Sequence, residues 1–99
     1  MYPRLERLEV MATPVSDTGL LAALSCLPRL THLDVRQCKR LTGPGVTPLS
    51  QVSPQLTSLK LSHCPGVSKE AANVLVAGLP RLQKLESRGL QVNYGKEGI

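Results

Sequence analysis

Cysteine and histidine side chains are the groups in this chain of 99 residues that could hold a metal ion. His32 precedes Cys38 by six residues, and His63 is the immediate neighbour of Cys64. Zinc sites usually space their ligands as Cys-x-x-Cys or His-x-x-x-His, and neither spacing occurs around these residues. Cys38 and Cys64 instead lie 26 residues apart, a spacing that many other residues share. The sequence therefore predicts two buried structural thiols, with no bound metal ion and no cofactor.

Ser62 and His63 are adjacent residues of the types that serve as a nucleophile and its general base. Such a pair also needs a third group that orients the base, and no acidic residue is obviously associated with these two. The segment Gly43-Pro44-Gly45 lacks the lysine and the spacing of a phosphate-binding loop. We therefore expect that the chain is not an enzyme.

The spacing of the cysteines belongs to a repeat of about 26 residues that runs through the chain. Two sets of leucines recur with this period. One set is Leu5, Leu30, Leu56 and Leu82, and the other is Leu8, Leu33, Leu59 and Leu85. A proline stands two residues before each leucine of the first set, at Pro3, Pro28, Pro54 and Pro80. This regularity predicts about four copies, starting near residues 3, 28, 54 and 80, within a domain of residues 1–90.

Each copy begins with the pattern Leu-x-x-Leu-x-Leu, or a close variant of it, and this alternation predicts a short strand. A hydroxyl residue then opens a helix by capping its free amides. Ser16 predicts a helix from about Asp17 to Cys26, and Ser68 predicts one from about Lys69 to Ala77 that ends at Gly78.

The second copy departs from this pattern, because Gly43, Pro44, Gly45 and Pro48 follow Thr42. A proline inside a helix removes a backbone hydrogen bond, so only a broken or single-turn helix is expected there. Stacking of the copies predicts an α/β leucine-rich-repeat solenoid, with a short parallel sheet on the concave face and helices or irregular turns on the convex face. Residues 91–99 show no helix-opening signature and are expected to form a flexible tail.

Copies two and three also resemble a particular family. Each has a cysteine three places after the last apolar strand residue, then an apolar residue and a hydroxyl residue, as in Cys38-Lys-Arg-Leu41-Thr42 and Cys64-Pro-Gly-Val67-Ser68. This pattern resembles the cysteine-containing leucine-rich repeats of F-box/leucine-rich-repeat proteins. The resemblance implies that the repeats hold a substrate, while a separate F-box joins the SCF ubiquitin-ligase scaffold. Only Met1 and Tyr2 precede Pro3, so we expect a C-terminal piece, a short isoform or a truncated product without an F-box.

Polar residues between the strand leucines are the candidates for binding a protein partner, since they project from the concave face while the leucines point inward. These candidates are Arg7, Glu9, His32, Asp34, Arg36, Ser58, Lys60, Ser62, Lys84, Glu86 and Arg88. One column across the stacked strands should read Glu9, Asp34, Lys60 and Glu86, which places Lys60 between two carboxylates. A solvated ladder of exposed ion pairs, each worth about 0–1 kcal/mol, is the simpler interpretation of the same residues.

These features together predict a protein–protein interaction module whose partner is unidentified. A substrate-recognition fragment related to F-box/leucine-rich-repeat receptors is the first hypothesis, with a ligase substrate as its partner, and a scaffold or adaptor unconnected with a ligase is the second. The net charge of +5 would suit nucleic acid, but two tyrosines are the only aromatic residues, which argues against base stacking. No apolar run approaches the length of a membrane span. Three cysteines without a secretory signal predict a cytoplasmic or nuclear location.

Overall fold

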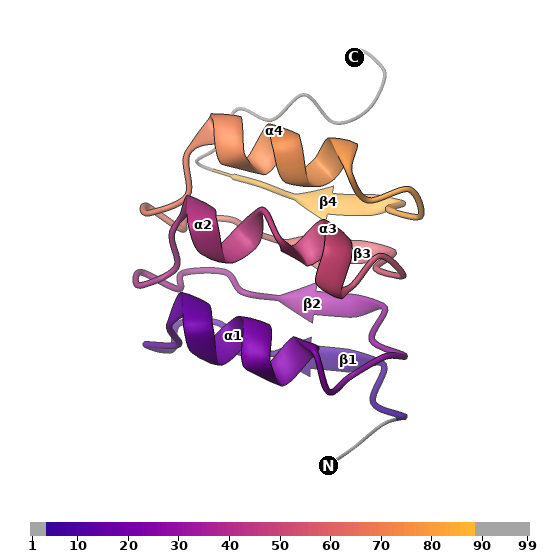
Figure 1. The fold of residues 1–99 in the computed structure, drawn as a ribbon. Helices are drawn as coiled ribbons and strands as arrows, with labels where there is room; N and C mark the ends of the chain where they lie inside the picture. Colours follow the sequence, from indigo (N-terminus) through magenta and orange to yellow (C-terminus); the bar gives the residue numbers. More distant parts are fainter. Residues whose placement is uncertain (1–3, 89–99) are drawn as a thin grey trace.

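Strands and helical segments alternate along residues 4–88, which are the residues that this computed structural model describes. Their order is β1 (Arg7–Glu9), α1 (Asp17–Leu24), β2 (His32–Asp34), α2 (Gly43–Val46), α3 (Leu49–Val52), β3 (Ser58–Lys60), α4 (Lys69–Ala77) and β4 (Lys84–Glu86). The strands form one parallel sheet in the order β1-β2-β3-β4, and the helical segments form a layer on one side of it (Figure 1). This α/β arrangement is compatible with a leucine-rich-repeat-like fold.

Residues at equal positions of the 26-residue repeat pair directly across the sheet. Leu33 of β2 pairs with Leu8 on one side and with Leu59 on the other, and Leu59 pairs in turn with Leu85. Leu33 and Leu59 are buried, whereas Leu8 and Leu85 are only partly buried because they stand in the outer strands of the described sheet. The core therefore consists of a row of strand leucines against apolar residues of the helical layer, such as Leu20, Leu49 and Leu75.

Serine caps begin the two long helices as the sequence predicts. The Oγ atom of Ser16 accepts a hydrogen bond of 3.1 Å from the amide of Gly19, and Ser68 accepts one of 3.1 Å from Ala71. Helix α4 spans Lys69–Ala77 and is followed by Gly78, so its predicted bounds are confirmed. Helix α1 ends at Leu24, two residues before the predicted end, because the amides of Cys26 and Leu27 bond to carbonyls three positions back and tighten the chain after Ser25.

The second copy contains two single-turn helices in place of one longer helix, as its glycines and prolines predict. Helix α2 ends at Val46, and α3 begins at Leu49. Pro48 stands between them and has no amide hydrogen to donate to the carbonyl of Pro44, which is the bond that a continuous helix would need. The predicted interruption is therefore confirmed, and the missing amide hydrogen of Pro48 contributes to it.

A left-handed backbone turn follows each of the first three strands. Ala12, Gln37 and His63 occupy the same position of the repeat and have φ values of 59°, 61° and 63°. The amide of each donates to a carbonyl of the next copy, over 2.8 Å for Ala12, 3.0 Å for Gln37 and 2.9 Å for His63. These turns thus extend the hydrogen bonding between copies beyond the short strands. The sequence does not reveal them, because none of the three residues is glycine.

We expect the variant Gln37→Gly to be more stable to unfolding than the natural chain, by up to about 1 kcal/mol. A left-handed conformation costs a residue with a Cβ atom about 1–2 kcal/mol, and glycine escapes this cost while losing more entropy on folding. Urea denaturation followed by circular dichroism measures the difference. The matched control is Gln51→Gly, which places the same substitution in helix α3 and should destabilise by roughly 1 kcal/mol. Equal effects of the two substitutions would contradict the prediction.

Candidate protein-binding face

The candidate site is the open face of the sheet, meaning the face that is turned away from the helical layer. In the sheet register, Glu9, Asp34, Lys60 and Glu86 form one column, and Arg7, His32, Ser58 and Lys84 form the next. The first column is the one predicted from the repeat. A hollow of about 190 Å³ lies on this face, and the predicted residues that line it are Arg7, Glu9, His32, Asp34, Ser58, Lys60 and Lys84.

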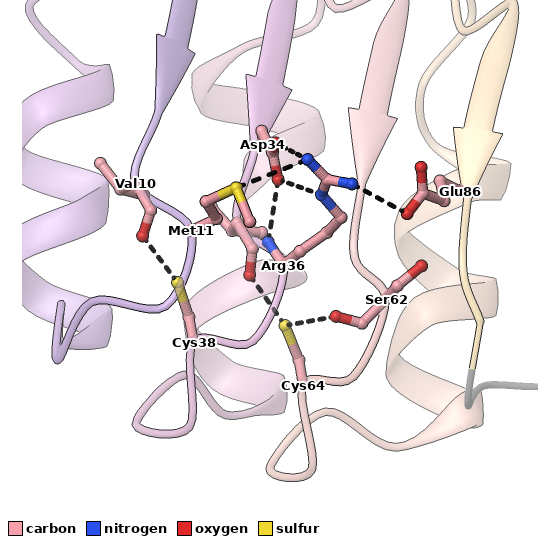
Figure 2. Close-up of polar contacts among 9 residues, drawn as sticks. Val10, Met11, Asp34, Arg36, Cys38, Ser62, Cys64 and Glu86 are labelled. Carbon is pink, nitrogen blue, oxygen red and sulfur yellow. Dashed lines mark hydrogen bonds and ion pairs between the residues drawn. The ribbon is translucent and has the colours of Figure 1, made fainter.

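Arg36 forms ion pairs with two carboxylates of this face, those of Asp34 and Glu86. Its guanidinium makes two hydrogen bonds to Asp34, with Nε 2.9 Å from Oδ1 and Nη2 2.7 Å from Oδ2. The same guanidinium extends to β4, where Nη1 lies 3.4 Å from Oε2 of Glu86 (Figure 2). The backbone amide of Arg36 also donates to Asp34 Oδ1, over 3.1 Å. We call Arg36, Asp34 and Glu86 the Arg36 network, and it connects the second copy to the fourth.

Asp34 is a charged residue that is only 4% exposed, so its ionisation needs compensation. Burial acts to raise the pKa of its carboxyl group, but hydrogen bonds from the side chain and backbone of Arg36 oppose this, with attraction from Arg36 and Lys60. The balance holds the pKa of Asp34 below its ordinary value of 3.8. The carboxylate is therefore ionised at neutral pH, and its oxygens are already bonded.

Replacing Arg36 with methionine should lower the melting temperature at pH 7 by on the order of 5 °C. The carboxylate of Asp34 would remain buried without its donors, so its pKa should rise. In the natural chain Asp34 stabilises the fold above pH 3.8, its ordinary pKa, and this contribution is lost as the pH falls through the lowered pKa. The difference in melting temperature between the two proteins should therefore shrink from pH 7 to pH 3.

Arg88→Met is the matched control for this experiment, because the side chain of Arg88 is exposed and no ion pair involves it among the described residues. It should change the melting temperature little at any pH. A destabilisation by Arg36→Met that stays constant from pH 7 to pH 3 would show that Asp34 is not the group concerned.

Two of the predicted binding residues, Ser58 and Ser62, are buried. Ser62 is 1% exposed, and its Oγ atom accepts a hydrogen bond of 2.8 Å from the backbone amide of Arg88. Ser58 is also buried, so neither hydroxyl offers much surface to a partner. Arg7, Glu9, Lys84 and Arg88 are exposed. Four more of the predicted residues are partly exposed, namely His32, Arg36, Lys60 and Glu86, while Asp34 is buried. The sequence could not distinguish these cases, because alternation places all of them on one face.

The thiols of Cys38 and Cys64 lie where one copy meets the copy before it (Figure 2). Cys38 Sγ donates to the carbonyl of Val10 over 3.1 Å, and Cys64 Sγ donates to that of Val35 over 2.9 Å. Both cysteines are buried, as predicted, and burial raises the pKa of the Cys64 thiol. Cys26 is exposed. Within residues 4–88, no group of three or more His, Cys, Asp and Glu side chains could hold a metal ion.

A second hollow, of about 600 Å³, lies at the left-handed turns and was not predicted from the sequence. Its lining residues are Ala12, Thr13, Pro14, Gln37, Lys39, Arg40 and His63. The turn residues Gln37 and His63 are 26 positions apart, so the repeat spacing could have indicated that they lie together. Their side-chain types alone gave no such signal.

Comparison with known proteins gives a partial relationship. No family model matches the chain. A protein of Arabidopsis thaliana named "Putative F-box/LRR-repeat protein 21" is 48% identical over 43 residues, which are 43% of this chain and 14% of that protein. The chain therefore matches a small part of that relative's length. The likeness, together with the fold, weakly supports a relationship to F-box/leucine-rich-repeat proteins over the matched stretch.

Among the described residues, no helix has the length and apolar character needed to cross a membrane.

Proposed function

We propose that this chain is a protein-binding module of leucine-rich repeats, stacked as a solenoid, which binds its partner on the open face of the sheet. The observation that carries this proposal is the pair of in-register polar columns around one hollow. Sheet faces lined by unlike charges can sort partners by their charge pattern. The proposal includes no enzymatic activity, and it places the protein in the cytoplasm or nucleus.

We further propose that the module is a substrate-recognition fragment related to the receptors of SCF ubiquitin ligases. The partial likeness to an F-box/LRR-repeat protein supports this view, as do the repeated cysteines at Cys38 and Cys64. A leucine-rich-repeat scaffold without a ligase would have the same fold. Reading the whole coding sequence on both sides of these 99 residues separates the two, since an F-box favours the ligase and its absence from the entire reading frame favours the scaffold.

Site-specific photo-crosslinking in cells tests which face binds. A benzophenone amino acid at Glu9, which lines the hollow, should give adducts of discrete mass. The same amino acid at Val74 is the control, because that residue of α4 is 62% exposed on the helical layer. Adducts from Val74 and none from Glu9, or equal adducts from both, would refute binding on the open face.

A further inference from the structure

We infer that the hollow on the open face binds an extended acidic peptide, with carboxylate side chains held by Arg7, Lys60 and Lys84. This inference rests on the proposed function, since it assigns a partner chemistry to the same face. It follows from which charged groups of the face are already paired and which remain available.

The carboxylates of the Arg36 network are already paired with a cation of the protein itself. Asp34 is buried with both oxygens bonded to Arg36, and Glu86 shares the same guanidinium. By contrast, Arg7, Lys60 and Lys84 line the hollow without an ion pair to any described residue within 4.0 Å. Glu9 is the one lining carboxylate outside the network among the described residues. The hollow therefore presents three cationic donors and a single free carboxylate.

Arg7, Lys60 and Lys84 line one hollow, which distinguishes them from an isolated basic residue such as Lys69. Lys60 is partly buried in the third strand, and it lies close enough to Asp34 to help lower the pKa of that group. A concave surface with low-dielectric walls focuses the field of the charges that line it. Lys69, in contrast, is exposed on the helical layer and lines neither hollow. An anion should thus be held more strongly in this hollow than at Lys69.

The sheet register also sets the spacing of the carboxylates. Arg7 and Lys84 stand at the two ends of the same column, in the first and fourth strands. Their backbones are therefore separated by three strand spacings, or roughly 14 Å. An extended peptide advances about 3.3 Å per residue and points alternate side chains the same way. Acidic residues at positions i and i+4 would therefore reach Arg7 and Lys84, and one between them at i+2 would face the middle of the hollow.

The test uses the full chain and a fluorescein-labelled peptide with glutamate at alternate positions, Gly-Glu-Ser-Glu-Ser-Glu-Gly, in fluorescence anisotropy titrations. Lys60→Gln and Lys84→Gln should each weaken binding about threefold or more, in the range of a modest charged contact. The matched control Lys69→Gln should change affinity less than twofold, and unchanged melting curves show that all variants are folded. Failure of the natural chain to bind the peptide, or equal weakening by all three substitutions, would overturn the inference.

Glu9→Gln gives a second readout that a merely structural effect would not produce. Removing the free carboxylate of the hollow should tighten peptide binding about twofold, while adding salt should weaken it in every variant. Unchanged or weaker binding by Glu9→Gln counts against the inference. Crosslinking from Glu9 together with no peptide binding would show that the open face binds a partner of other chemistry, so the two proposals fail separately.

Discussion

Truncation of Leu59 to alanine should lower the free energy of unfolding by about 2–5 kcal/mol, the usual cost of emptying a well-packed core position. Leu59 is fully buried in β3 and pairs with Leu33 and Leu85 across the sheet. The matched control is Leu85→Ala, at the same position of the outer strand β4, where the side chain is only partly buried. This substitution should cost clearly less.

Urea denaturation followed by circular dichroism compares the two variants. If Leu59→Ala prevents folding, Leu59→Met keeps the side-chain volume and should cost less than about 1.5 kcal/mol. Equal losses for Leu59→Ala and Leu85→Ala would show that the row of leucines is not packed most tightly at its centre.

Gly66→Ala should destabilise the chain by about 1–3 kcal/mol, the cost of forcing extra volume into a packed site. A Cβ atom at Gly66 would lie 2.2 Å from the carbonyl oxygen of Leu41, and a backbone oxygen cannot rotate away as a side chain can. The loops of the second and third copies would therefore have to separate. Thermal unfolding measures the effect.

Gly19→Ala is the control for this steric prediction. The nearest atom to a Cβ at Gly19 is the Oγ of Ser16 at 3.3 Å, and the residue lies in helix α1, where alanine is favoured. This variant should differ from the natural chain by less than about 1 kcal/mol. A Gly66→Ala protein as stable as Gly19→Ala would mean that the two loops are not in close contact.

The strand pairing could be predicted from the sequence because it depends on copy length alone. Copies of nearly equal length place Leu8, Leu33 and Leu59 side by side when the strands are parallel. The bounds of α4 could be predicted because a capping serine and a terminal glycine act on the nearest backbone groups, whereas α1 has no terminal glycine and its end was predicted two residues too late. The interruption at Pro48 is also a local effect.

The cation that pairs with the carboxylates of Asp34 and Glu86 could not be predicted in the same way. The repeat places Lys60 between Asp34 and Glu86, and the structure has that register, but Arg36 makes the ion pairs with both carboxylates. Residues two apart on a strand lie on the same face, so Arg36 is adjacent to Asp34. Its planar fork then bonds both oxygens, whereas a lysine offers a single point charge.

The exposure of the polar side chains could not be predicted from the sequence either. Alternation assigned Ser58, Ser62 and Asp34 to the polar face, yet all three are buried. Small or short polar side chains on a sheet are covered by longer neighbours, such as Arg36 over Asp34. The face available to a partner is consequently made by the longer charged residues, and the inferred ligand is acidic because Arg7, Lys60 and Lys84 are unpaired within the described residues.

The positions of the two buried thiols allow opening between copies to be timed separately. Each thiol bonds to the preceding copy, Cys38 to the first and Cys64 to the second, while Cys26 is exposed and gives the reference rate for a thiol in solvent. An alkylating reagent can modify a buried thiol only when its own junction opens. Two different protection factors would therefore describe a chain that separates from one end, whereas two equal factors would describe a chain that unfolds as one unit.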